Sequence, residues 1–241
     1  MTRSNLERVG QEKPASLPLL LLLLTVTTGL IDAVSVLGLG RVFTANMTGN
    51  VVFLGFALAR VPGFSPVRSV AALAAFLAGA VIGGRLGIRL DGSRGRWLAT
   101  VAVVESSLLF AAALTALGYD GEQLVPVARL YSLIGLTAVA MGLRNATVRR
   151  LAVPDLTTTV LTLTLAGLGA DSSFAGGDNP RFARRVGSVA AMLAGAVAGG
   201  MLVLSVGVAW PLAASGAITL LATLIYVARR SPTAAPPRLR G

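Results

Sequence analysis

The 241-residue sequence contains no cysteine and no histidine. These absences exclude disulfides and thiol chemistry and remove the commonest zinc ligands, so we expect no metal site and no cofactor. Charged residues are also scarce, at 13% of the chain, against about 25% in soluble domains. So few charges cannot coat a globular surface of this size, whereas a surface facing lipid needs none. The composition therefore predicts a membrane protein in a lipid bilayer.

Apolar sequence is abundant instead, with 54% hydrophobic residues and a mean hydropathy of +0.77. Six apolar segments of about 20 residues can each cross a bilayer of about 30 Å, and two of about 15 residues suit re-entrant or half helices better. The fold class predicted is an all-α polytopic membrane protein with six spanning helices and two short ones. In chain order the eight segments are 17–38, 47–61, 67–88, 97–118, 127–147, 156–170, 185–206 and 209–228, of which the second and sixth are short.

The net charge of +11 could suggest a nucleic-acid partner. We reject that interpretation because the arginines form short clusters between apolar runs, as topology signals do. If both short segments re-enter and the N-terminus is cytoplasmic, 17 Lys and Arg residues lie inside and 4 outside. Eight spans give 13 against 8, and seven spans with an outside N-terminus give 15 against 6. The six-span arrangement is favoured, with both termini in the cytoplasm and the protein in a bacterial inner membrane.

The chain divides into a polar N-terminal segment, 1–16, a single membrane domain, 17–228, and a basic, proline-rich tail, 229–241. The apolar run that begins at Leu17 is interpreted as the first membrane helix and not as a removed leader. Within the domain, LAGAVIGG at 77–84 recurs as LAGAVAGG at 193–200, TANMTGNV at 44–51 aligns with VPDLTTTV at 153–160, and GLIDA at 29–33 aligns with GLRNA at 142–146. These matches predict two repeats, 17–118 and 127–228. Three spans in each repeat would invert the second relative to the first.

Polar residues inside apolar segments are the candidates for a substrate or ion pathway, because such groups in hydrocarbon must be bonded or face water. Asn46 can cap a helix that begins at Met47, and Asp155 holds the matching position in the second repeat. Asp32 has Asn145 as its repeat mate, and a pair with the neighbouring Arg144 is one possibility. Capping, or a purely structural carboxylate, is the alternative for each. The full set is Asp32, Ser35, Asn46, Thr48, Asn50, Glu105, Asn145, Asp155, Thr157 and Thr158.

The glycine-rich repeats have the small-x-x-x-small spacing that lets two helices approach closely. We expect them to pack the two halves against each other. The glycines concerned are Gly79, Gly83, Gly84, Gly195, Gly199 and Gly200. Trp97 and Trp210 stand at segment ends, as interfacial anchors do.

GLIDAVS at 29–35, VFTANMTGN at 42–50, MGLRNA at 141–146 and DLTT at 155–158 resemble the YoaK-like family of bacterial multi-pass membrane proteins. The resemblance extends from about Leu17 to Tyr226. It implies a multi-pass membrane protein and, because that family is a domain of unknown function, no substrate and no catalytic residue. The second repeat lacks the Gly-Asn of the first, so the two short segments need not do equivalent jobs.

Three functions remain open from the sequence. The favoured one is a secondary transporter or channel for a small solute or ion, with its site at the repeat interface, and not an enzyme. A membrane scaffold or sensor partner is the second. An intramembrane hydrolase with Asp32 and Asp155 as an acid pair is the third. The identity of the solute and the oligomeric state stay open.

Overall fold

Six long helices form the bundle. The computed structural model describes residues 16–154, 156, 158–159 and 161–229, and this part of the chain is helical apart from loops and one isolated bridge between Asp120 and Val125. All six helices are long and apolar enough to cross a membrane. The all-α polytopic fold is therefore confirmed. The long helices are α2 (Ser16–Gly38), α4 (Pro66–Arg89), α5 (Arg94–Thr115), α6 (Val127–Leu151), α8 (Phe182–Val206) and α9 (Ala209–Ala228).

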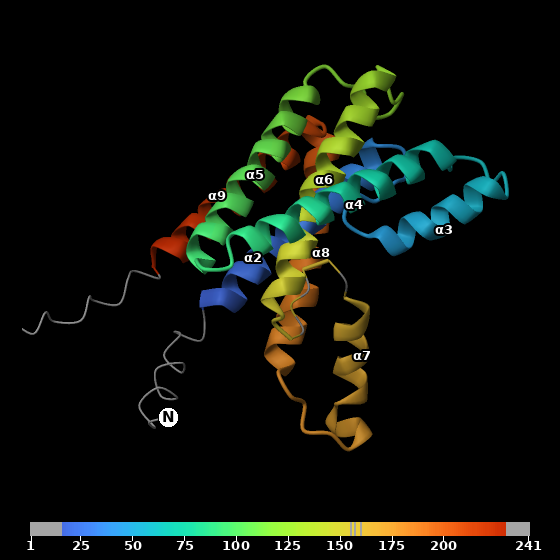
Figure 1. Cartoon of the computed structure of the whole chain (residues 1–241). Helices are drawn as coiled ribbons and strands as arrows, with labels where there is room; N and C mark the ends of the chain where they lie inside the picture. Colours follow the sequence, from blue (N-terminus) through green and yellow to red (C-terminus); the bar gives the residue numbers. More distant parts are fainter. Residues whose placement is uncertain (1–15, 155, 157, 160, 230–241) are drawn as a thin grey trace, which may run out of the picture.

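Two short helices, α3 (Met47–Leu58) and α7 (Thr162–Ala170), lie where the short apolar segments were predicted, and a 3-10 turn, η2 (Ser173–Ala175), follows α7. They contain 12 and 9 residues. At 1.5 Å per residue they measure about 18 and 14 Å, roughly half of a bilayer core. α3 runs beside α4, and α7 runs beside α8 (Figure 1). Neither short helix is long enough to span.

The second short helix begins later than the sequence pattern predicted. The apolar segment starts at residue 156, but α7 begins at Thr162 and has Leu161, not Asp155, at its N-cap position. Pro154 has no backbone N–H, and Thr158 has a left-handed φ of 62°, which a helix does not admit. The expectation that Asp155 caps this helix is therefore wrong. Asp155 itself and Thr157 lie outside the described residues.

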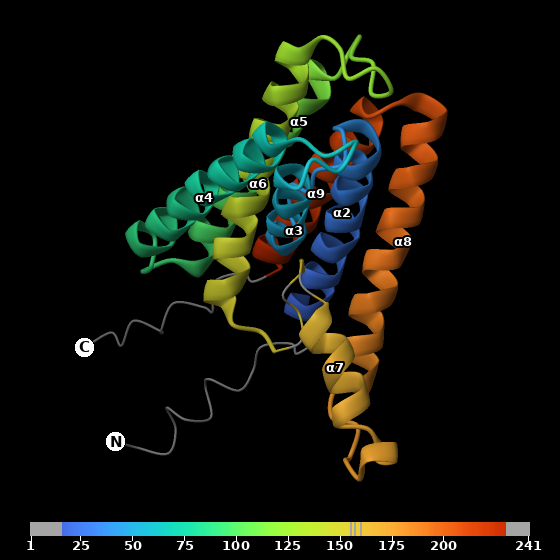
Figure 2. The same cartoon turned by 90° about the vertical axis from the view of Figure 1, so that its right-hand side faces the viewer.

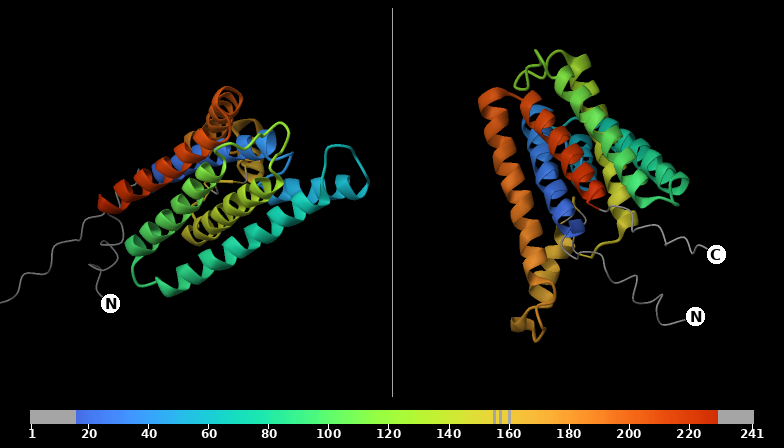
Figure 3. Two further views of the ribbon diagram at one scale, coloured as in Figure 1. Left: turned by 90° about the horizontal axis from the view of Figure 1, so that it is seen from above. Right: turned by 90° about the vertical axis from the view of Figure 1, so that its left-hand side faces the viewer.

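The long helices pair across the two predicted repeats. α2 packs against α8, α4 against α6, and α5 against α9. Figures 2 and 3 show α4 and α8 on the two outer sides of the bundle, with α2, α5, α6 and α9 between them. The α2–α8 and α4–α6 contacts are equivalent when the two predicted repeats are exchanged, because α2 corresponds to α6 and α4 to α8, whereas the α5–α9 contact joins corresponding helices. Three of the six candidate spans fall in each predicted repeat; that the second repeat crosses the bilayer in the opposite direction to the first stays a prediction.

Glycines make these pairings close. A Cβ on Gly79 would lie 2.1 Å from the Val139 carbonyl oxygen, and one on Gly195 would lie 2.0 Å from that of Val26. No side chain fits there, so the helix backbones of α4 and α6, and of α8 and α2, are in direct contact. Gly142 contributes from the α6 side, where a Cβ would meet the Phe76 oxygen at 2.0 Å.

The other four glycines divide into two kinds. Gly83 and Gly199 also lie at these contacts, with a Cβ coming within 2.9 Å and 2.8 Å of neighbouring atoms. Gly84 has nothing within 4 Å, and the nearest atom to Gly200 is 3.8 Å away. Each is one residue further along, which turns it about 100° around the helix, away from the contact. The packing expectation is therefore wrong for Gly84, whereas a Cβ on Gly200 would make an ordinary contact with Leu37 of α2 and not a close one.

A side chain ties the loop after α5 to the end of α2. The Tyr119 hydroxyl donates to the Gly38 carbonyl oxygen at 2.9 Å. Burial raises the pKa of Tyr119 to about 12.

Candidate functional site

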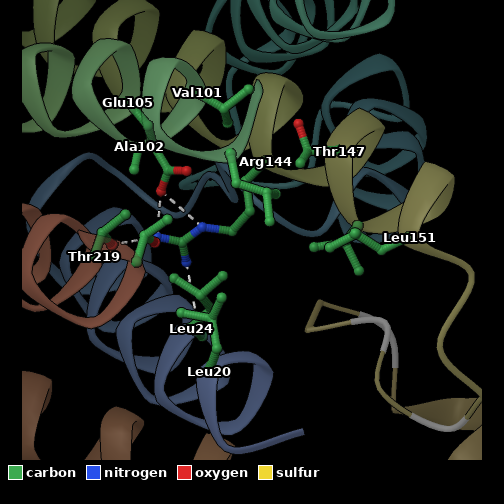
Figure 4. Close-up of a pocket in the computed structure, with 12 residues that line it drawn as sticks. Leu20, Leu24, Val101, Ala102, Glu105, Arg144, Thr147, Leu151 and Thr219 are labelled. Carbon is green, nitrogen blue, oxygen red and sulfur yellow. Dashed lines mark hydrogen bonds and ion pairs between the residues drawn. The ribbon is translucent and has the colours of Figure 1, made fainter. Parts of the chain in front are cut away.

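Arg144 is the largest fully buried side chain in the described part of the bundle, with 1% of its surface exposed. Its Nε donates to Glu105 Oε1 at 2.7 Å, and its Nη2 donates to the same oxygen. Glu105 is 2% exposed. The two side chains form a buried ion pair between α6 and α5 (Figure 4).

Threonine hydroxyls and a backbone carbonyl accept hydrogen bonds from the remaining N–H donors of the Arg144 guanidinium. Nη1 donates to Thr27 Oγ1 at 2.8 Å, to Thr28 Oγ1 at 3.1 Å and to the Leu24 carbonyl at 3.0 Å. Nη2 donates to Thr219 Oγ1 at 2.9 Å. Every guanidinium nitrogen therefore has a partner, as a charge at membrane depth requires. The network joins α2, α5, α6 and α9, and Glu105, Thr27 and Thr219 lie near the middle of their helices.

A cavity beside the ion pair is too small for a solute. Its volume is ≈ 20 Å³, which is room for about one water. Apolar side chains make up most of its wall. The lining residues are Leu20, Leu24, Leu98, Val101, Ala102, Glu105, Arg144, Thr147, Val148, Leu151, Thr219 and Thr223.

Asp32 forms a second polar site, on α2 next to the loop that leads into α3. Its Oδ1 is buried and has no hydrogen-bond partner among the described residues. The carboxylate interacts with the backbone N–H of Ala45. Thr44, the neighbour of Ala45, is fully buried and its Oγ1 has no partner either. Two unpaired polar atoms are thus buried near the start of the short helix.

The loop that carries Thr44 is held firmly to α3. The fully buried Asn50 accepts from the Phe43 N–H at 2.9 Å and returns a hydrogen bond from Nδ2 to the Phe43 carbonyl. Asn46 occupies the N-cap of α3 and accepts from the Gly49 N–H at 3.5 Å, a long bond. The Phe43 ring lies where a Cβ of Gly49 would be, 2.6 Å away, and stacks on Phe53 with ring centres 5.5 Å apart.

The second repeat carries a different arrangement at the equivalent place. Asn145, the repeat mate of Asp32, donates from Nδ2 to the Met141 carbonyl at 2.8 Å. Its Oδ1 accepts from Thr159 Oγ1 at 2.5 Å. Thr158 is fully buried, and its Oγ1 has no hydrogen-bond partner among the described residues. The amide of Asn145 is therefore bonded on both sides, whereas the carboxylate of Asp32 keeps one oxygen open.

The candidates thus fall into three groups instead of one. Asp32 lies near the loop fixed by Asn46 and Asn50, Glu105 belongs to the Arg144 network, and Asn145 lies with Thr158 and Thr159. Two candidates contribute little: Thr48 is exposed on α3, and Ser35 only donates to the Asp32 backbone carbonyl at 3.0 Å.

The possible Asp32–Arg144 pair is not formed, because Glu105 and threonines take the arginine's donors. Sequence reasoning missed Thr27, Thr28 and Thr219. The signal was present in the three threonines of TVTT at 25–28, inside a leucine-rich run. The described residues contain no group of His, Cys, Asp and Glu that could hold a metal ion.

Comparisons with known proteins identify the family of the chain. The model of a family described as "Protein of unknown function (DUF1275)" matches residues 20–225. The chain belongs to this family. It is also 35% identical over 155 residues to the UPF0700 transmembrane protein YoaK of Bacillus subtilis (strain 168), a match that covers 64% of this chain and 66% of that protein. No solved structure matches the chain.

This membership bears out the resemblance drawn from residues 29–50 and 141–158. The transmembrane relative and the six long apolar helices agree on a multi-pass membrane protein. Because the matched family is described by its unknown function, the case for an activity depends on the three polar groups themselves.

Proposed function

We propose that the protein is a secondary transporter or channel, not an enzyme, and that it moves a proton or a small cationic solute between its two repeats. The observation that carries the proposal is the buried, unpaired Oδ1 of Asp32 beside the loop that leads into α3. An intramembrane carboxylate is expensive, so one that lacks a full set of partners is a functional site by default.

The chemistry around Asp32 favours a positive ligand. A carboxylate oxygen accepts hydrogen bonds or coordinates hard cations. Thr44 Oγ1, also buried and unpaired, offers a second oxygen or a donor. Asn50 is not available for this purpose, because both ends of its amide bind Phe43. The ligand would thus meet a rigid loop on one side and α2 on the other.

Passage beyond Asp32 requires the central network to open. The hydrogen-bond network around Arg144 and Glu105 joins α2, α5, α6 and α9. The cavity beside it has room for about one water. In inverted-repeat transporters, one part of the bundle moves against the other around a central site. We assign the network to the closed gate of such a cycle, with the Asn145 and Thr158 group beyond it.

Cysteine accessibility tests the pathway without knowledge of the solute, since the chain has no cysteine of its own. A Thr44→Cys variant in proteoliposomes should react with a charged, membrane-impermeant methanethiosulfonate reagent. The control is Leu77→Cys at the middle of α4, whose side chain is 62% exposed on the outer surface of the bundle and faces lipid. If Thr44→Cys stays as unreactive as Leu77→Cys, no water-filled route reaches Asp32, and a scaffold or sensor role is favoured instead.

Flux through the route tests the role of Asp32. Proteoliposomes loaded with a pH-sensitive dye, or with a sodium-sensitive dye, should show proton or sodium flux driven by a potassium–valinomycin potential. Asp32→Asn should abolish the flux, while Glu122→Gln, which changes a loop carboxylate, should not. Equal flux in Asp32→Asn and the unaltered protein would remove Asp32 from the pathway.

A further inference from the structure

A second pocket lies where the loop between α4 and α5 meets the end of α6. Its volume is ≈ 240 Å³, and it shares only Leu151 with the cavity beside Arg144. The remaining lining residues are Asp91, Arg94, Trp97 and Arg150. None of these belongs to the proposed pathway. Two arginines and an indole facing one pocket form a group of donors suited to an anion.

Trp97 provides the observation that points to a missing ligand. Its side chain is buried, with the residue 6% exposed, yet its Nε1 has no hydrogen-bond partner among the described residues. A buried donor without an acceptor costs about 1–3 kcal/mol. The Arg150 guanidinium lies over the Trp97 ring, 5.8 Å from its centre. One side chain that lines the pocket therefore combines a buried, unpartnered N–H with a ring that contacts a cation.

The start of α5 adds further donors. Trp97 lies in the first turn of this 22-residue helix, and Ser93 at the N-cap makes no side-chain capping bond. The backbone N–H groups of Gly95 and Arg96 belong to the turn that has no intrahelical acceptors. The positive end of the helix dipole also favours an anion here.

Asp91 is the opposing charge at this pocket. Its Oδ1 accepts from Arg150 Nη2, and its side chain is 74% exposed at the rim. Among the described lining residues, Asp91 is the one carboxylate, beside Arg94 and Arg150. Its bond to Arg150 occupies the place that a phosphate oxygen would take.

We propose that this pocket binds the phosphate of an anionic phospholipid headgroup. Arg94 and Arg150 would pair with the phosphate oxygens, as arginine does elsewhere, and the Trp97 N–H would donate to the same group. A lipid is favoured over free phosphate because the pocket lies at the ends of three spanning helices, at headgroup level, where tryptophan is enriched. Exposed Arg89 and Arg96 nearby favour an anionic over a zwitterionic headgroup.

The test is lipid binding to the purified full-length protein, followed by thermal unfolding and by mass spectrometry of the intact complex. Phosphatidylglycerol, phosphatidylethanolamine and inorganic phosphate are the three probes. Phosphatidylglycerol should bind the unaltered protein most tightly. Arg150→Gln should weaken it by about tenfold or more, and Trp97→Phe, which keeps an aromatic ring but removes the N–H and the second ring of the indole, by about fivefold.

Two further variants keep the result interpretable. Arg149→Gln removes the neighbouring exposed arginine, which does not line the pocket, and should leave the affinity unchanged. Asp91→Asn removes the carboxylate that pairs with Arg150 and should tighten phosphatidylglycerol binding several-fold, because it removes the competing anion. Three outcomes would overturn the proposal: equal weakening by Arg149→Gln and Arg150→Gln, equal binding of the two lipids, or saturation by inorganic phosphate alone.

Discussion

The buried ion pair makes the sharpest prediction about stability. Glu105→Leu removes the carboxylate and leaves the Arg144 guanidinium, 1% exposed, with threonines and a carbonyl only. Arg144→Met removes the charge from the other side and leaves a buried Glu105. The double variant places two apolar side chains of similar length between α5 and α6. The three variants form a double-mutant cycle.

The magnitude follows from the surroundings of the pair. Removing one partner of a buried pair costs about 3–5 kcal/mol, because the other charge is left without compensation. Replacing both partners by apolar groups is often neutral or stabilising by about 1–4 kcal/mol. Thr27, Thr28 and Thr219 lose a bond in Arg144→Met, but the Thr27 and Thr28 hydroxyls also donate to the Leu24 carbonyl. We therefore expect a coupling energy of at least about 3 kcal/mol.

Thermal unfolding in a single detergent measures the cycle. At about 2–4 °C per kcal/mol for a chain of this size, each single variant should lower the Tm by about 6 °C or more. The double variant should unfold within a few degrees of the unaltered protein. If the effects of Glu105→Leu and Arg144→Met simply add in the double variant, the two charges are not coupled and the assignment of a closed central gate is refuted.

Three other predictions concern packing and topology. Gly195→Ala should destabilise the bundle by about 1–3 kcal/mol, because its Cβ would lie 2.0 Å from the Val26 carbonyl oxygen. Gly84→Ala should be neutral or slightly stabilising. Equal unfolding temperatures of the two variants would contradict the close helix contact at Gly195. Asn50→Leu should cost about 1–3 kcal/mol and increase hydrogen exchange in residues 41–46, since the Phe43 backbone loses both partners; unchanged exchange would show that Asn50 does not hold the loop. Ser65→Cys should label from outside intact cells and Ser173→Cys only after permeabilisation, and labelling of both on one side would rule out two re-entrant short helices.

The number and placement of the helices could be predicted because they depend on local composition. A run of about 20 apolar residues has few alternatives to a membrane helix. Segment 67–88 matches Pro66–Arg89 and segment 209–228 matches Ala209–Ala228. The late start of α7 was not predictable from hydropathy, because Leu156 and Val160 are as apolar as the residues of a helix. What changes the backbone there is the left-handed Thr158.

The candidate site was less predictable, because a polar residue in a membrane segment signals that a partner exists but not which one. In the repeat alignment Asp32 matches Asn145, which directly follows Arg144 in the sequence. Opposite charge alone therefore favours an Asp32–Arg144 pair. The guanidinium instead meets Glu105, which is 39 residues away in the sequence. That choice depends on how α5 packs against α6, a long-range contact without a local sequence signal. The close contacts of Gly79 and Gly195 were predictable because both glycines occupy the same position in the repeated segments 77–84 and 193–200.

A comparison of matching positions in the two repeats distinguishes residues needed for helix packing from polar residues with another role. Glycine contacts appear in both halves: Gly29 against α8 matches Gly142 against α4. Next to these matching glycines, the polar residues differ between the repeats. The second repeat has Arg144 where the first has Ile31, and Asn145 where the first has Asp32. If these side chains served only to hold two similar halves together, both halves would need them equally. The fully bonded Asn145 shows that an amide fits this position, so the open carboxylate of Asp32 is not a requirement of the fold, and the proposed cation site belongs to the first repeat alone.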